Sequence, residues 1–198
     1  MRISCARLGS IVPIVLAACV SETVPSGPVL PSTVLVNEGN GVVLTVQGAG
    51  AVDLSAAAAG EADFQFVAHK NADGSAWGHF RQSRSTAAGT VDFEGIVICL
   101  TIAPNFPGRA RIGGRVTANN STNPAFLTTN HEVGDDVWFR VQDGGVSGDA
   151  DDRSTTYGFK PILVDTSEQY CALPFDGLPW WNPASIFPLA RGAISLIN

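Results

Sequence analysis

The stretch Asp63-Phe-Gln-Phe-Val-Ala-His69, the turn Asn71-Ala-Asp-Gly74 and the following Ser75-Ala-Trp-Gly-His-Phe-Arg81 decide the fold class of this chain. In both flanking runs apolar and polar residues alternate, which is the period of a half-buried β-strand. Asp73-Gly74 lies between the runs, and a glycine there supplies the positive φ that a tight hairpin turn demands. We therefore expect an antiparallel β-hairpin.

A second pair of alternating runs follows this hairpin. Stepping by two along the first run, one face carries Val91, Phe93, Gly95, Val97 and Cys99. After the loop Ile102–Gly108, one face of the second run carries Ala110, Ile112, Gly114 and Val116. We expect both faces to point into the core. Glycines inside such runs are typical of bulges or bends that let a sheet curve, and here they are Gly78, Gly95, Gly113 and Gly114.

The rest of the chain is consistent with an all-β domain. No long segment has the apolar period of a helix, and further strands are expected at Val42–Val46, Asp136–Val141, Thr155–Phe159 and Ile194–Ile197. We thus predict a single antiparallel domain of seven or eight strands over residues 34–198. Such a sheet must hide its apolar face and its edges by closing into a barrel or folding into a sandwich, and we favour the barrel.

The first eighteen residues have the features of a signal peptide. Arg2 and Arg7 precede an apolar run that is too short to span a membrane, and the run ends in Leu16-Ala17-Ala18-Cys19. These four residues resemble the bacterial lipobox. The resemblance implies a lipidated Cys19, a membrane anchor without a spanning segment, and a location at the outer membrane or cell surface. The alternative is ordinary cleavage, which would leave a secreted protein.

Residues 19–33 are expected to form a flexible tether between the lipid and the domain, because they are rich in proline. The whole chain has a formal net charge of −6, with 12 basic and 18 acidic side chains. Removal of Arg2 and Arg7 with the leader leaves 10 basic side chains against 18 acidic ones, a charge of −8. A protein this acidic lacks the basic surface that binds nucleic acid.

Two cysteines remain for the mature domain, because Cys5 leaves with the leader and Cys19 would carry the lipid. In an oxidising compartment Cys99 and Cys171 are expected to form a disulfide. It would close a loop of about 70 residues, which the chain-entropy model values at about 4 kcal/mol. The alternative is one buried thiol and one loop thiol that never meet.

Several short motifs occur along the predicted strands. They are Thr45-Val-Gln-Gly-Ala-Gly50, the Phe64/Phe66 strand with Ala72-Asp-Gly-Ser75, Gly95-Ile-Val-Ile-Cys99, Ala110-Arg-Ile-Gly-Gly-Arg-Val-Thr117, Val141-Gln-Asp-Gly-Gly145 and Asp152-Arg-Ser154. Together they resemble a β-rich domain found in secreted and cell-surface bacterial proteins. The resemblance covers roughly Val42 to Cys171 and implies a β-rich fold without catalytic residues. The chain departs from the pattern in its alanine-rich stretch Ala56–Ala59 and in its aromatic C-terminal segment.

Three histidines are candidates for metal binding or general base chemistry. His69 and His79 lie on partner strands of the first hairpin and would share a face, so that a two-histidine site with Glu132 is conceivable. His131 lies in an Asn/Thr-rich loop, and no metal-ligand spacing such as His-Glu-x-x-His occurs. The alternative is three surface histidines. Cys99, expected to face the core, is a poor nucleophile candidate.

Three further segments carry candidate binding residues. The loop Asp143–Asp152 offers the carboxylates Asp143, Asp149, Asp151 and Asp152, which suit calcium or form a solvated acidic loop. The proline-rich segment Leu173–Leu189 contains Trp180 and Trp181. It would either plug one end of the β-domain or expose these indoles to a ligand, a glycan or a protein partner. A third candidate is an arginine stripe, which we expect to be a solvated sheet face partly neutralised by Asp92 and Glu94: Arg109, Arg111 and Arg115.

Two classes of function follow from these features. The first is an envelope lipoprotein whose non-catalytic β-domain binds or scaffolds an unknown partner and needs no cofactor. The second is an enzyme of unrecognised type that uses His69, His79 and His131 or the acidic loop. Convergence of the histidines and an acid in one cleft would favour the enzyme, and scattered positions would favour the binding module.

Overall fold

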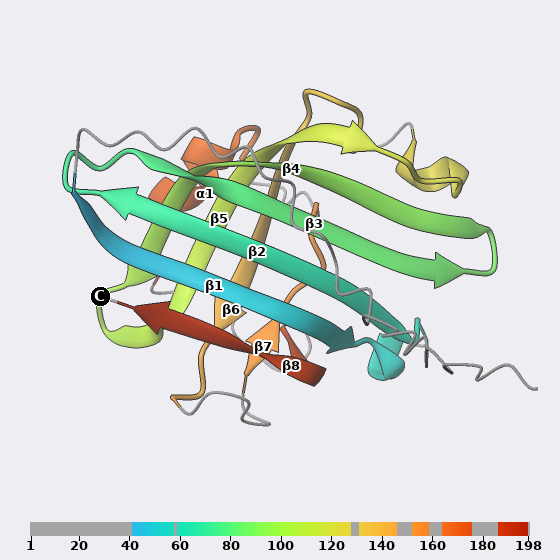
Figure 1. The fold of residues 1–198 in the computed structure, drawn as a ribbon, viewed down its shortest axis with the longest axis horizontal. Helices are drawn as coiled ribbons and strands as arrows, with labels where there is room; N and C mark the ends of the chain where they lie inside the picture. The colour runs from blue at the N-terminus through green and yellow to red at the C-terminus, as the bar shows by residue number, and fades with distance from the viewer. Residues whose placement is uncertain are drawn as a thin grey trace, which may run out of the picture. The chain divides into compact units, whose positions relative to one another are not determined.

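The chain closes one antiparallel sheet of eight strands into a barrel, as the alternating pattern predicted (Figure 1). The computed structural model describes residues 41–57, 59–127, 131–145, 152–158, 164–175 and 186–197. Each strand pairs with its neighbour in sequence, and β8 returns to pair with β1. The elements are β1 (Val42–Asp53), η1 (Ser55–Ala57), β2 (Glu61–Asn71), β3 (Ala76–Thr86), β4 (Gly89–Ala103), β5 (Phe106–Asn119), η2 (Pro124–Phe126), β6 (Asp136–Gln142), β7 (Arg153–Ser154), α1 (Ser167–Ala172) and β8 (Phe187–Ile197).

The predicted hairpin is confirmed as β2–β3. Its turn is closed by a backbone hydrogen bond of 2.9 Å from the Gly74 amide to the Asn71 carbonyl, and Gly74 has a φ of 87°. The Asp73 carboxylate accepts hydrogen bonds from the Ser75 amide and hydroxyl. These local interactions set the register, which pairs His69 with Trp77 and Phe66 with Phe80.

The interior of the barrel is occupied by aromatic side chains. The Tyr157 ring stacks on Phe139 with 3.8 Å between centroids, and Phe80 packs edge-on against both rings. Phe80 lies so close to β4 and β5 that a Cβ added at Gly95 or Gly114 would come within 2.4 or 2.6 Å of its ring. The two glycines therefore leave the space that Phe80 occupies.

The expectation that Cys99 faces the core is wrong. The pairing of β4 with β5 shifts its register between Val97 and Cys99, so one residue is inserted and the alternation of faces reverses. Leu100 (2% exposed) then points inward, and Cys99 lies on the outer face of the barrel. There it forms the predicted disulfide with Cys171 of α1, with 6.2 Å between the Cα atoms.

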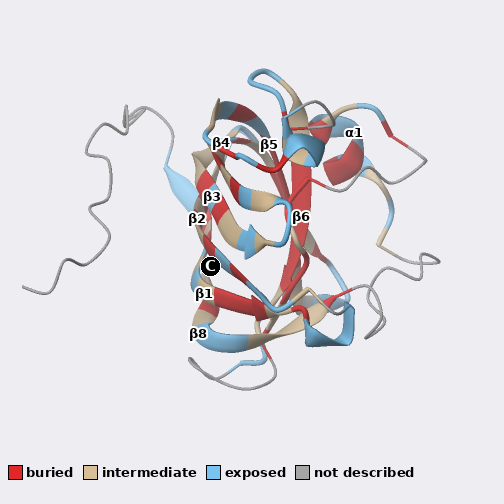
Figure 2. Cartoon of the chain, turned by 90° about the vertical axis from the view of Figure 1, so that its right-hand side faces the viewer, coloured by how far each residue is buried: buried red, intermediate tan, exposed pale blue. Residues whose placement is uncertain are grey.

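A small second core lies outside the barrel, between α1 and strands β4 to β6 (Figure 2). The Trp138 ring stacks on Tyr170 with 5.5 Å between centroids, and both side chains are fully buried. Because this face is covered, β6 is buried on both sides along most of its length. Burial raises the pKa of the Tyr170 hydroxyl well above its usual range, whereas the cations of Arg140 and Arg111 act in the opposite direction.

The expected solvated arginine face is contradicted at Arg111, which is fully buried beneath the segment that follows α1. Its guanidinium donates hydrogen bonds to the carbonyl oxygens of Leu173 (2.6 Å) and Pro174 (2.8 Å). It also lies 4.1 Å from the ring centroid of Phe175. The described start of the proline-rich segment therefore packs on the outer wall of the barrel.

Two strand boundaries differ from the prediction near the C-terminus. β7 contains only Arg153 and Ser154, and Thr155–Gly158 is not a strand. Residues 155 and 158 still donate backbone hydrogen bonds to β6, but Gly158, the last described residue of this stretch, has a φ of 82°, which is outside the range of a regular strand. In addition, β8 begins at Phe187, inside the segment expected to be irregular. Pro188 is tolerated there because it lies near the start of β8, just outside the pairing with β1, which ends at Leu189.

Candidate functional site

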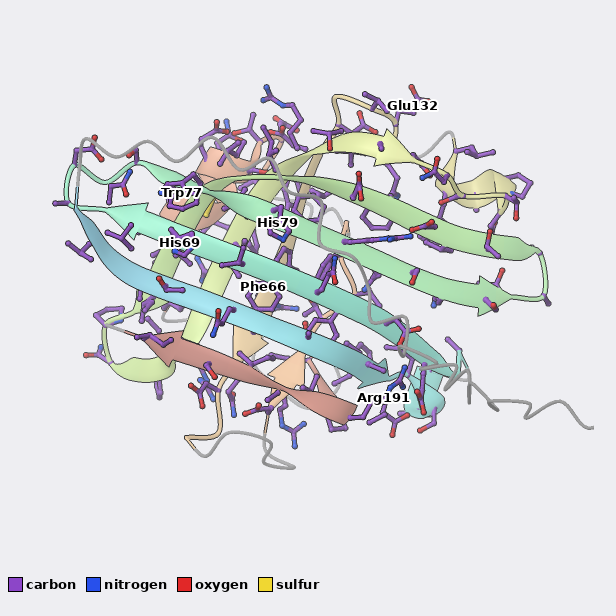
Figure 3. The ribbon with its side chains drawn as sticks, in the orientation of Figure 1. Phe66, His69, Trp77, His79, Glu132 and Arg191 are labelled. Carbon is purple, nitrogen blue, oxygen red and sulfur yellow. A yellow bond between two sulfur atoms is a disulfide. The ribbon has the colours of Figure 1, made fainter. Side chains whose placement is uncertain are left out.

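His69, Trp77 and His79 form a cluster on the outer face of β2 and β3, which we call the outer-face cluster (Figure 3). The residues alternate with the inward-facing Ala68 and Phe80, so the pleat turns all three side chains outward. The imidazole of His69 packs against the indole of Trp77, with 4.0 Å between ring centroids. His79 lies on the diagonal to His69, because it pairs with the next outward residue, Val67.

Hydrogen bonds hold the two stacked rings in place. The Trp77 Nε1–H donates to the Asn71 Oδ1 at 3.2 Å. The His69 Nδ1 lies 2.8 Å from the Thr45 Oγ1 on β1. Because Asn71 holds the Trp77 ring and Thr45 holds the His69 ring, the cluster is preorganised for contact with another molecule.

Two effects lower the pKa of the His69 imidazole below its ordinary value of 6.5. The larger is desolvation by burial, and the second is repulsion by a charged His79. Both disfavour the protonated form, so His69 presents a neutral, aromatic surface at pH 7. On β4 the cluster continues to Ile96, which pairs with His79 and is 49% exposed.

His131 does not join the other two histidines. It is 5% exposed and lies between Phe93 and Phe126, with ring centroid distances of 4.6 and 4.8 Å. Its Nε2 is 3.4 Å from the Tyr157 carbonyl oxygen. The prediction of a surface histidine is therefore wrong here, and Figure 3 places Glu132 away from His69 and His79.

Asp143 and Asp152 use their carboxylates to hold backbone amides. Asp152 is fully buried and accepts hydrogen bonds from the Gly144 amide (2.8 Å) and the Ile194 amide (2.7 Å). Asp143 accepts from the amides of Gly145 (2.7 Å) and Leu196 (2.9 Å). Each of the four oxygens thus accepts a hydrogen bond from a backbone amide, which gives both acids a structural role.

The other members of the arginine stripe are paired individually. Arg115 forms an ion pair with Asp136 at 3.1 Å. Arg109 donates to the Gln142 side chain and lies over the Phe106 ring, 4.6 Å from its centroid. The predicted neutralisation by Asp92 is wrong, because Asp92 pairs with Arg81 at 2.9 Å.

Several predicted features lie outside the described residues: the signal peptide 1–18, Cys19 with the tether 19–33, Asp149, Asp151, Trp180 and Trp181. Within the described ranges, no group of three His, Cys, Asp or Glu side chains is arranged to hold a metal ion. No helix in the same ranges has the length and apolar character needed to cross a membrane.

Sequence reasoning did not select Trp77 or Ile96 as functional candidates. The signal was present for Trp77, because the turn at Asp73-Gly74 defines the register and period-two alternation then places His69 and Trp77 on one face. The position of Ile96 beside His79 follows from the pairing of β3 with β4. The sequence has no tight-turn motif between these strands from which that register could be predicted.

Comparisons of this chain with models of protein families, with curated proteins and with solved structures find no match.

Proposed function

We propose that the protein is a bacterial envelope lipoprotein whose β-barrel is a non-catalytic binding module, and that the outer-face cluster is its binding surface. The observation that carries the proposal is the stacked pair of His69 and Trp77, which is fixed by hydrogen bonds and partly exposed. Tryptophan is enriched at binding hot spots, where a rigid aromatic surface is buried with little loss of conformational freedom.

The location of the core supports an external rather than an internal binding surface. The interior is filled by rings such as Phe66, Phe139 and Tyr157, which contact one another at centroid distances of 3.8 to 5.2 Å. A ligand inside the barrel would have to displace these side chains. A ligand on the outside meets His69, Trp77 and Ile96 without any rearrangement.

The arrangement of the histidines supports binding rather than catalysis. Convergence of His69, His79 and His131 with an acid in one cleft would favour the enzyme hypothesis. His131 instead packs between Phe93 and Phe126. Of the acidic loop, the described Asp143 and Asp152 accept hydrogen bonds from backbone amides, so the described candidates favour a binding module.

The anchor is tested by metabolic labelling with a palmitate analogue. We expect label on the wild-type chain and none on Cys19→Ser, which should be released or left unprocessed. Label on neither chain would contradict the lipoprotein assignment and leave an ordinary secreted protein.

The binding surface is tested by nuclear magnetic resonance of the full lipidated chain in nanodiscs, with labelled tryptophan indoles and isoleucine methyls. We expect one envelope fraction, either cell-wall glycan or soluble envelope protein, to shift the Trp77 indole and Ile96 methyl signals saturably. Trp77→Ala should weaken the effect on Ile96 at least about tenfold, the loss of roughly 1.4 kcal/mol at a modest hot spot. Val133→Ala, at an exposed site in the β5–β6 connection, is the matched control.

Saturable shifts confined to the indoles of Trp180 and Trp181 would move the binding surface to the proline-rich segment and contradict the assignment. Shifts in none of the fractions would contradict it as well.

A further inference from the structure

One end of the barrel combines the start of the domain with exposed apolar side chains. In an antiparallel barrel of consecutive strands, odd-numbered strands begin and even-numbered strands finish at the same end. β1 therefore begins at this end, directly after Gly41, and β8 finishes there (Figure 1). Gly41, the first described residue, therefore lies at this end.

Four large apolar side chains are exposed at this end: Val42 (48%), Val43 (53%), Phe106 (45%) and Ile197 (52%). We call them the tether-side rim. Val43 and Ile197 lie on paired strands, because Thr45, the next outward residue after Val43, pairs with Ile197. Such side chains cost free energy in water unless another apolar surface covers them.

We infer that the tether-side rim rests on the surface of the lipid bilayer that holds the anchor. The inference depends on the proposed lipidation of Cys19. From Cys19 to Gly41 the chain has 22 steps. The flexible tether that the sequence predicts would have a root-mean-square span of roughly 26 Å at that length. The anchor therefore keeps the rim at a high effective concentration relative to the lipid, so a weak apolar contact is sufficient to hold the rim on the bilayer.

Among the described residues near this end the charges balance, which favours an apolar contact over an electrostatic one. Lys70, Arg109 and Arg153 contribute cations, whereas Asp73, Asp143 and Asp152 contribute carboxylates. The Arg109 guanidinium lies 4.6 Å from the centroid of the Phe106 ring. This cation therefore packs against an apolar side chain of the rim. Binding should accordingly need no anionic lipid.

The test uses the full lipidated chain in phosphatidylcholine vesicles, with a fluorophore on Val42→Cys and, as a matched control, on Val133→Cys. Val133 is 67% exposed and lies in the connection at the opposite end of the barrel. Brominated lipids quench only probes that reach the bilayer. We expect at least twofold stronger quenching at position 42 than at position 133, with no increase when phosphatidylglycerol is added.

A second variant keeps the test independent of the probe. Val43→Asp with Ile197→Asp should reduce quenching at position 42 to the level at position 133, whereas Leu127→Asp should not. Equal quenching at both positions in palmitate-labelled protein overturns the inference and leaves the lipid anchor standing. Quenching at position 42 that needs anionic lipid, or protection there by a second copy of the chain, overturns it too. Absence of palmitate label instead overturns the proposed function.

Discussion

Asp152 shows how a single side chain completes the barrel where a strand is too short. β7 pairs with β8 only at residues 153 and 154, so the amides of Ile194 and Leu196 receive no partner from it. The carboxylates of Asp152 and Asp143 accept hydrogen bonds from these two amides. A buried amide without an acceptor is costly, and a charged acceptor gives a stronger hydrogen bond than a carbonyl.

Asp152→Asn should destabilise the protein, because an amide side chain has one acceptor and would direct its NH₂ group at one of the two backbone amides. We expect a loss of about 2 kcal/mol, typical of a buried hydrogen bond to a charged group. For a domain of this size the melting temperature should fall by roughly 4 to 8 °C. Thermal unfolding measures the change.

Asp143→Asn is the matched control for this substitution, because its carboxylate also accepts from two amides but is partly exposed to water. Its effect should be the smaller of the two. Equal stability of Asp152→Asn and the wild type would contradict the assigned role of Asp152.

At the scale of elements, α1 is too short to be stable by itself and depends on its contacts with the barrel. It has six residues, whereas isolated helices in water require more than ten or so. The disulfide joins Cys171 of α1 to Cys99 of β4, and the Tyr170 ring stacks on Trp138 of β6. The Ser167 hydroxyl lies within hydrogen-bonding distance of two carbonyl oxygens, those of Gly114 (2.9 Å) and Val137 (3.0 Å).

Reduction of the disulfide should loosen α1 first. The bond joins residues 72 apart, which the chain-entropy model values at about 4 kcal/mol. The melting temperature should therefore fall by roughly 8 to 16 °C. Amide exchange in α1 should accelerate before exchange in β2 does. The double variant Cys99→Ser with Cys171→Ser should behave like the reduced protein and be insensitive to reductant. An unchanged melt with two free thiols would show the bond to be unimportant for stability.

For the whole domain, the seam between β6 and β8 should be the place where the barrel opens. β7 contributes two paired residues there, whereas β1 pairs with β2 and with β8 over most of its length. Native-state hydrogen exchange should show the Ile194 and Leu196 amides opening about tenfold faster than the β1–β2 amides. Asp152→Asn should further increase the opening rate of the Ile194 amide relative to the β1–β2 amides. Uniform protection around the barrel would contradict this order.

The sequence by itself determined the all-β fold class and the first hairpin, and it favoured the barrel over the sandwich without deciding between them. Period-two alternation and an Asp-Gly turn are local properties, because each residue's face follows from its neighbours along the strand. The Cys99–Cys171 pair was also predictable, since elimination of the other cysteines left no different partner. His69 and His79 were placed on one face for the same local reason.

Only the tertiary structure decided which outer faces meet solvent. A single inserted residue after Val97 turned Cys99 outward. Gly113 and Gly114 on the facing strand indicated a bulge or bend, but not which strand carries the extra residue. The burial of Arg111 depends on α1 and on residues more than fifty positions away. His131 is buried because Phe93, from the distant strand β4, packs on it together with the nearby Phe126. Local pattern therefore specifies the strands and their alternation, whereas long-range pairing and packing decide where that alternation shifts and which face remains available for binding.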